Sequence, residues 1–269
     1  MTIALGQLTP VYLEWAAKAL TLAATGASWT VSSGRRAAHG VGQRGPFDSI
    51  PVDLAMSITC DFFVNYHADL AAGLGLINSV DGAELTTCYL TIGTVKIQGK
   101  MSALSFKISN EEELSGSLTI QGIAKTAVEA PSLPTAAALF SPNTLALTNL
   151  HTSAALQCSS LNISIANSVT GRRYMTASRL PAVLAEGKQT VAFDLTLLDV
   201  ADLPADITAA ALAKIAAPTI AVTDTQTEAK TLTFTFTNAL AIEQTGTLGM
   251  EDILEHGIKY EAEAIAFGT

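Results

Sequence analysis

Apolar and polar residues alternate along several stretches of this chain, and this alternation is its strongest structural signal. In residues 231–236, a leucine and two phenylalanines alternate with three threonines. Residues 52–60 and 161–165 alternate in the same way. A period of two sends successive side chains to opposite faces of a β-strand, so each stretch predicts a strand with one face in a core.

Further strands and a few short helices complete the expected pattern. Strands are expected at residues 29–33, 85–97, 104–108, 114–124, 156–166, 191–198 and 258–267. Helices are expected at residues 70–76 and 207–216, each after a capping aspartate, and at 250–256 before a glycine. Residues 10–23 stay open, because Thr9-Pro10 favours a helix start whereas the internal repeat favours a strand.

Three short motifs occur twice at one separation. Gly34-Arg35-Arg36 precedes Gly171-Arg172-Arg173 by 137 residues (171 − 34 = 137). The alternating strand around residue 54 and an Ala-Asp pair at residue 68 recur at the same separation. A repeat of this length predicts two copies of one structural unit.

The repeat sets the expected domain organisation. We expect a first unit at residues 1–124, a Pro- and Ala-rich linker at 125–144 and a second unit at 145–269. Each unit is expected to be mainly β, a sandwich or a partly open barrel, with a short α-helix after its central strand.

Composition narrows the class of protein. The chain has 269 residues, is 49% hydrophobic and 14% charged, and carries a formal net charge of −9. A chain with so many apolar residues is not disordered. Its apolar surface must be covered by contacts, either between the two halves or between chains. The negative net charge disfavours binding to nucleic acid. Without a secretory signal or a membrane-length apolar stretch, we expect a protein made in a reducing cytoplasm.

Enzyme and metal signatures are missing from the sequence. Cys60, Cys88 and Cys158 are widely spaced, as are the four histidines, and neither set has a ligand spacing. There is no phosphate-binding glycine loop and no nucleophile elbow. We therefore expect no enzymatic activity, no cofactor and no metal.

The repeated arginine pairs are candidate contact residues. Arg35, Arg36, Arg172 and Arg173 fall in two segments, residues 34–45, expected to be a loop or a protruding hairpin, and residues 171–188, expected to begin with a loop. They could bind carboxylates of a neighbouring subunit. The alternative is a pair of solvated turns that contribute little.

The order of elements resembles that of phage tail-tube (major tail) proteins. The resemblance rests on residues 161–168, the arginine motif at 171, residues 187–195, the expected helix after Asp206 and the terminal strand around residue 260. It covers the second half best and reaches the first half through the repeat. These are matters of element order and composition, not a diagnostic motif.

The resemblance implies an assembly. Tail-tube proteins form stacked rings whose inner sheets join into one β-barrel around a channel for DNA. Two units in one chain imply homotrimeric rings with pseudo-sixfold symmetry, located in the virion tail after synthesis in the host bacterial cytoplasm. A tape-measure protein and a tail terminator are the implied partners, without a membrane and without specific DNA binding. The segments at residues 34–45 and 171–188, with their arginine pairs, are candidates for bridging successive rings.

A channel for DNA would favour carboxylates on its wall, because they repel phosphate. Glu261 and Glu263 alternate with apolar residues in the last expected strand, and Asp194 lies opposite Phe193 and Leu195. We expect these three acids to face the channel; an ordinary exposed face or a subunit contact is the alternative. A tandem β-sandwich that binds a receptor or carbohydrate, or a component of a related injection machine, remains the alternative function.

Overall fold

A computed structural model gives the fold of the chain. It describes residues 11–38, 48–79, 84–109, 113–129, 139–150, 157–172, 180–198, 214–225, 230–248 and 254–269. The described part is mainly β, with one short helix, as the alternating pattern predicts.

The strands follow one another with few helical interruptions. They are β1 (Val11–Trp15), β2 (Lys18–Ala38), β3 (Asp48–Phe63), β4 (Cys88–Ile92), β5 (Val95–Ser109), β6 (Ser115–Ala127), β7 (Thr144–Thr148), β8 (Gln157–Arg172), β9 (Val183–Leu198), β10 (Thr219–Asp224), β11 (Lys230–Thr237), β12 (Leu240–Leu248), β13 (Leu254–Ala262) and β14 (Ala264–Gly268). Between β3 and β4 lie helix α1 (Leu70–Leu74) and a short 3-10 helix (Gly75–Ile77).

The first half closes into a six-stranded barrel. Its strands pair in the order β5-β4-β1-β2-β3-β6, and β6 pairs back with β5. All of these pairings are antiparallel, and apolar side chains such as Leu13, Ile58 and Leu104 are fully buried. Helix α1 lies against the barrel, with Gly73 close to the Trp15 ring. Closure leaves no free edge where the six strands meet.

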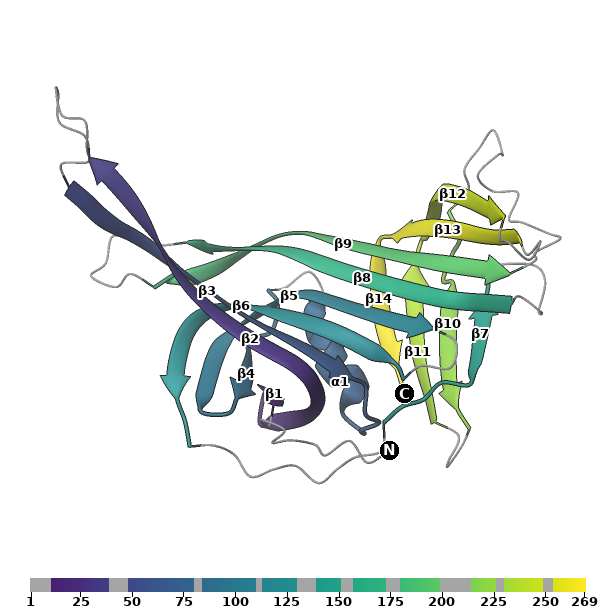
Figure 1. The fold of residues 1–269 in the computed structure, drawn as a ribbon, viewed down its shortest axis with the longest axis horizontal. Helices are drawn as coiled ribbons and strands as arrows, with labels where there is room; N and C mark the ends of the chain where they lie inside the picture. Colours follow the sequence, from purple (N-terminus) through teal and green to yellow (C-terminus); the bar gives the residue numbers. More distant parts are fainter. Residues whose placement is uncertain are drawn as a thin grey trace.

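The second half is a sandwich of two sheets. Strands β7, β10, β11 and β14 form a separate four-stranded sheet that packs across the long strands β8 and β9 (Figure 1). Phe193 links the layers, because its ring lies 4.7 Å from Tyr260 on its own sheet and 4.2 Å from Phe236 on the other. Aromatic pairs at such distances add to the stability that burial provides.

One sheet runs through both halves. The pairing of β5 with β8, from Ala103↔Ala166 to Ser109↔Ser160, joins the barrel to the sandwich. The result is a continuous antiparallel sheet of eight strands, in the order β2-β3-β6-β5-β8-β9-β13-β12. The first four strands belong to the first half and the last four to the second.

The two sets of four strands share their irregularities. The β2–β3 ladder shifts register after Ala24 and after Ser33, and the β8–β9 ladder shifts after Cys158 and after Asn167. The separations agree, since 158 − 24 = 134 and 167 − 33 = 134. Likewise, β5–β6 shifts after Met101 and β12–β13 shifts after Ala241, whereas the additional shift of β5–β6 after Gln98 has no counterpart within β12. Bulges are specific features of a sheet, so matching bulges identify matching positions.

Several sequence expectations need correction. Residues 11–15 and 18–23 are strand, since the ladder partners of β1 and β2 override the local helix signal. The strand expected at 85–97 turns at Gly93, whose φ is 54°. The strand expected at 258–267 divides at Glu263, and the helix expected at 250–256 is wrong for residues 254–256, which belong to β13. The helix expected at 207–216 is wrong for residues 214–216, where Ile215 forms a β-bridge with Ala239, and the rest of that segment lies outside the described residues.

The expected linker and arginine loops also differ in detail. Residues 125–127 belong to β6, and Phe140 is buried, with backbone hydrogen bonds to Val64 and Leu114. The first arginine motif lies within β2. The β2–β3 hairpin protrudes beyond the barrel (Figure 1), which agrees with the expected protruding hairpin rather than with a loop. Arg172 ends β8, and Arg173 lies outside the described part. The domain boundaries stay a prediction.

Candidate assembly surface

The continuous sheet has one apolar face and one polar face. The apolar face is covered by the other barrel strands and α1 in the first half, and by the four-stranded sheet in the second. The polar face carries small side chains in cross-strand rows, one of which runs through Ala192, Ser164, Ser105 and Ser117. A sheet with one covered face alternates in this way, so the sequence pattern and the structure agree.

Asp194 and Glu261 lie on this polar face. Asp194 is exposed and stands directly opposite Lys259 on β13 and Asn162 on β8. Glu261 is exposed and stands opposite Ala192. Lys259 therefore offsets part of the negative charge beside Asp194, which the strand-by-strand reading of the sequence did not anticipate.

Glu263 occupies a different environment from Glu261. It lies at the corner between β13 and β14, where its carboxylate binds the Lys214 ammonium and accepts a hydrogen bond of 2.7 Å from the Asn238 amide. These hydrogen bonds, that of Lys214 first, lower the pKa of Glu263. Asn238 has a positive φ of 50°, so the Glu263 carboxylate binds the side chain of a residue whose backbone is in the left-handed region. The structure places Glu263 in a corner contact and not in the row of Glu261.

The arginine motifs do not match each other in the two halves. Arg35 pairs with Pro51, and the matching pair in the second hairpin is Val169 with Glu186. The pair of Arg172 and Val183 in the second hairpin matches the pair of Ala38 and Asp48 in the first. The matching bulges place the two hairpins 134 residues apart, whereas the motif comparison used 137. The predicted equivalence of the two arginine motifs is therefore wrong. Arg172 is exposed at the end of β8.

The two end strands of the sheet expose apolar side chains that the sequence reasoning missed. Among the described residues, the exposed large apolar side chains are Trp29, Val31, Leu139, Val183 and Ile242. Trp29 and Val31 lie on β2, and Ile242 lies on β12. In the described ladders, residues 24–33 of β2 pair with β3 on one side only, and β12 pairs with β13 only. The sequence predicted a strand at residues 29–33. It did not indicate that side chains on both faces of this strand are exposed.

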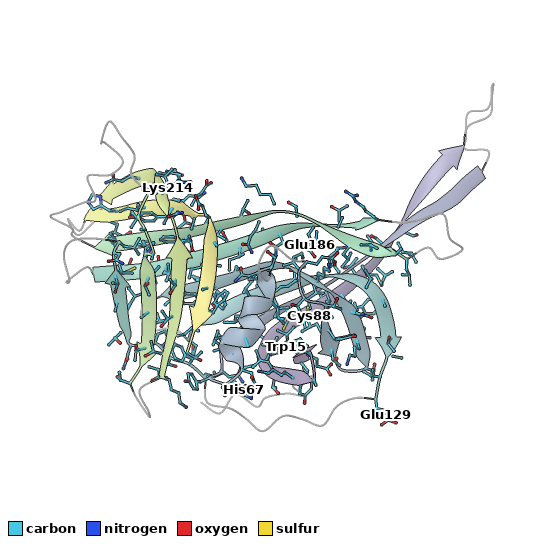
Figure 2. All side chains as sticks on the ribbon, turned by 180° about the vertical axis from the view of Figure 1, so that it is seen from behind. Trp15, His67, Cys88, Glu129, Glu186 and Lys214 are labelled. Carbon is cyan, nitrogen blue, oxygen red and sulfur yellow. The ribbon has the colours of Figure 1, made fainter. Side chains whose placement is uncertain are left out.

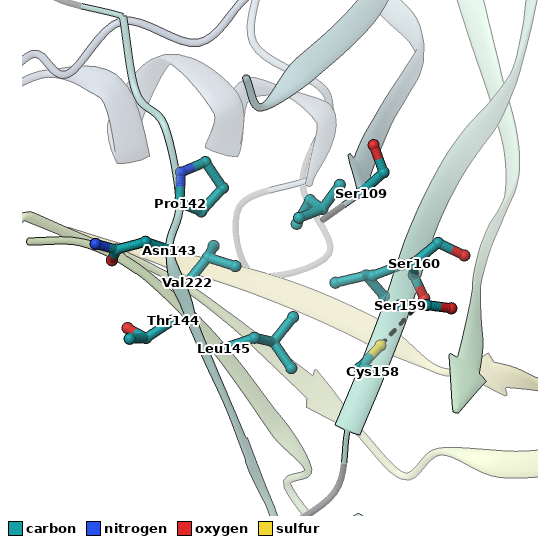
Figure 3. A pocket seen from close by; sticks show the side chains of 11 residues that line it. Ser109, Pro142, Asn143, Thr144, Leu145, Cys158, Ser159, Ser160 and Val222 are labelled. Atoms are coloured by element: carbon teal, nitrogen blue, oxygen red, sulfur yellow. Dashed lines mark hydrogen bonds between the residues drawn. The ribbon is translucent and has the colours of Figure 1, made fainter. Parts of the chain in front are cut away.

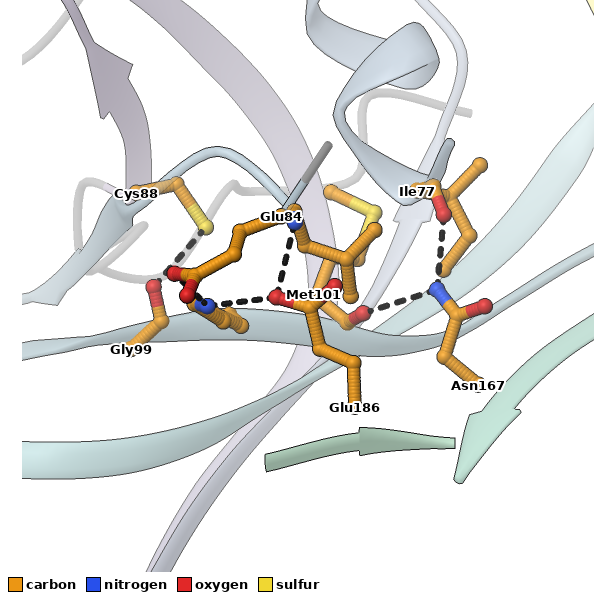
Figure 4. A network of polar contacts seen from close by, with 9 residues as sticks. Ile77, Glu84, Cys88, Gly99, Met101, Asn167 and Glu186 are labelled. Carbon is orange, nitrogen blue, oxygen red and sulfur yellow. Dashed lines mark hydrogen bonds and ion pairs between the residues drawn. The ribbon is translucent and has the colours of Figure 1, made fainter. Parts of the chain in front are cut away.

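A buried ion-pair network ties the two halves together. Lys100 on β5 binds Glu186 on β9 and lies 3.1 Å from Glu84, and the Glu186 carboxylate also accepts the Leu85 N–H at 2.7 Å (Figure 4). The Lys100 side chain is 9% exposed. Burial lowers the pKa of Lys100, but the hydrogen bonds to Glu186 and Glu84 outweigh it, so the net shift is upward. Asn167 adds a hydrogen bond of 2.6 Å to the Ile77 carbonyl.

A small pocket opens between β7 and β8. Its polar lining includes Asn143, Ser159 and Ser160, and the Cys158 thiol there donates to the Ser160 carbonyl at 3.1 Å (Figure 3). Burial raises the pKa of Cys158 to about 11, so the thiol is not an activated nucleophile. The pocket gathers no acid, base and nucleophile that could act together.

Other reactive side chains are scattered. In Figure 2, His67 lies away from Glu186, whereas Cys88 and Glu186 both border the network around Lys100 that Figure 4 shows. Burial raises the pKa of Cys60 and of Cys88 to about 12. Within the described ranges, no group of three or more His, Cys, Asp or Glu side chains could hold a metal ion. In the same part of the chain, no helix has the length and apolar character needed to cross a membrane.

No family model and no curated protein matches this sequence.

Proposed function

We propose that this chain is a structural subunit that assembles into rings, and that the rings stack into the tube of a phage tail, through which DNA leaves the virion. One observation carries the proposal: four strands of each half join in the same order into a single antiparallel sheet, and in the described chain β12 and residues 24–33 of β2, at its two ends, pair on one side only. The resemblance to tail-tube proteins supplies the biological setting.

Free sheet edges favour association. An unpaired edge presents a row of backbone N–H and C=O groups that can pair with another chain, and proteins that stay monomeric block it with charges, prolines or bulges. The two bulges of β2 lie at the ends of the stretch from Gly26 to Ser33, and within that stretch β2 carries no charge, no proline and no register shift. Because the two free edges differ, joining them is a head-to-tail contact, which repeats around a ring until the ring closes.

The polar face suits the wall of a channel. The opposite face of the sheet is already covered within the chain, so a closed ring would turn the polar face toward the lumen, with its small Ser, Thr and Ala side chains and the row of Lys107, Asn162, Asp194 and Lys259. Three chains would supply 3 × 8 = 24 strands, and barrel diameter grows with strand number beyond that of porins with about 16–18 strands. Asp194 and Glu261 would then repel DNA phosphates along the wall.

Electron microscopy tests this proposal directly. The purified full chain should form rings or tubes with a central channel as its concentration is raised. Rings stacked coaxially support a tube, whereas persistent monomers at high concentration would contradict the proposal and favour a monomeric binding module.

A further inference from the structure

Matching positions in the two halves differ sharply in exposure. By the shared bulges, Trp29 on β2 matches Ile163 on β8, and Val31 matches Ile165. Ile163 and Ile165 are each 1% exposed, whereas Trp29 is 43% and Val31 is 39% exposed. The buried pair lies where β8 meets β5, so the exposed pair marks a place where β2 lacks the corresponding neighbour.

The β5–β8 junction within the chain shows how a strand could pair with the free edge of β2. Strand β5 pairs with β4 through residues 95–99 and, along the same edge, with β8 through residues 103–109. In the second half, β11 pairs with β10 and β14 in the separate sheet, and β12 pairs with β13 on one edge but has no partner on its other edge in the described chain. The matched bulges after Met101 and Ala241 place β12 in the position of β5, at a separation of 140 residues (241 − 101 = 140).

We infer that β12 of one chain pairs antiparallel with β2 of the next copy of this chain, in the register of the internal β5–β8 junction. Transferring Ala103↔Ala166, Leu104↔Ile165, Ser105↔Ser164 and Phe106↔Ile163 gives Glu243↔Ser32, Gln244↔Val31, Thr245↔Thr30 and Gly246↔Trp29. This inference rests on the proposed ring and specifies its subunit contact.

The side chains brought together in this register are compatible. Gly246 has no side chain, so it leaves room beside the large Trp29 ring, an arrangement known to stabilise glycine in a sheet. Thr245 opposite Thr30 places two β-branched hydroxyl side chains together, a favourable cross-strand pair. Glu243 would face Ser32, so the register sets no like charges directly opposite each other.

Lys125 does not block this contact. Its ammonium lies 3.5 Å from the centre of the Trp29 ring, a cation–π contact on the ring's face within the same chain. The ring is still 43% exposed with Lys125 in place. The apolar area that remains is available to a neighbouring strand.

Cysteine cross-linking tests the register. The variants are Thr30→Cys with Thr245→Cys, and Val31→Cys with Gln244→Cys, both in the full chain with Cys158→Ser. Adjacent antiparallel pairs alternate between wider and closer spacing, so one of the two pairs has the close approach that a disulfide needs. Within one chain the two edges are seven strand spacings apart, roughly 30 Å, so any such disulfide joins two chains.

The expected result is a ladder of covalent oligomers on oxidation, ending at the closed ring. The matched control, Thr245→Cys with Ser28→Cys, moves one partner by two residues and should cross-link at least about fivefold less. Equal cross-linking in the control would overturn the register. Rings in the microscope that cross-link at neither pair would overturn the contact while leaving the proposed function standing; absence of rings in the unmodified chain would instead contradict the proposed function.

Fluorescence of the unmodified chain gives a second measurement that needs no variant to fold. The chain has two tryptophans, and Trp15 is only 6% exposed, so Trp29 dominates any change in exposure. Assembly should shift the emission to shorter wavelength and reduce acrylamide quenching. Assembly with unchanged quenching would overturn the proposed contact.

Discussion

Trp29 and Ile163 occupy the same position in two matching hairpins, yet one is 43% exposed and the other is 1% exposed. Ile163 is buried beside Phe106, its partner across the β5–β8 junction. Trp29 has no such cross-strand neighbour within the described chain apart from β3. The proposed pairing of β2 with a neighbouring chain rests on this difference between the two residues.

Replacing Trp29 by alanine should prevent assembly while leaving the monomer folded. Trp29 is largely exposed, and its contact with Lys125 contributes about 0.5–1 kcal/mol, so the free energy of unfolding should fall by no more than about 1 kcal/mol. The matched variant Ile163→Ala should cost about 2–5 kcal/mol, because it leaves a cavity in the core. Urea denaturation and sedimentation together check both outcomes; normal assembly of Trp29→Ala contradicts the account.

Lys100 is expected to be important for holding the halves together. Lys100→Met removes the partner of Glu186, whose side chain is only 19% exposed, and should lower the free energy of unfolding by about 1–3 kcal/mol. The control is Lys96→Met, since Lys96 pairs with Glu14 at 2.8 Å in a more exposed setting and should cost at most about 1 kcal/mol. Equal destabilisation of the two variants would show that the buried network has no special role.

Reversing charge on the polar face should slow DNA release without preventing tube formation. Asp194→Lys with Glu261→Lys adds positive charge to the proposed channel wall, which attracts phosphate, and added salt should weaken the effect. Glu129→Lys is the matched control, because Glu129 is exposed away from the sheet (Figure 2). The measurement is the rate of DNA ejection from particles carrying each variant. Unchanged rates in the double variant count against a lumenal position for these acids.

Acid should weaken the corner contact of Glu263 and the contact of Asp69 with Lys18. Hydrogen bonds to Lys214 and to Lys18, respectively, lower the pKa of each carboxyl in the folded chain. A lowered pKa gives stabilisation that is present above the ordinary values of 4.5 and 3.8 and is lost as the pH falls through the folded values. The melting temperature of Glu263→Gln should therefore fall less between pH 6 and pH 3 than that of the unmodified chain; parallel curves would exclude a contribution from Glu263.

Local patterns predicted the strands well where one face is buried. Leu232, Phe234 and Phe236 are all fully buried, as their alternation indicated, and the same holds for Leu161, Ile163 and Ile165. Residues 10–23 could not be settled in this way, because a helix-start signal and a strand partner compete there, and only the ladders of β1 with β2 and with β4 decide. Glu263 was misplaced because a sequence gives no direct sign of a corner that turns one strand into two.

The candidate surface was less accessible from sequence. The repeat was recognised from arginine and aspartate motifs, but its true register comes from bulges, which depend on pairing between strands. Exposure of Trp29 depends on which strand lies next to β2, and that is a property of the whole sheet. Sequence patterning therefore indicated two β units and polar faces, while the free edges emerged only from the fold.

The mass of the assembled ring, measured by native mass spectrometry, tests the central claim most directly. The account predicts closed rings of three chains, each of 27.9 kDa, because each chain supplies two of the six wall segments. A ring of six chains, or a monomer that persists at high concentration, would contradict it.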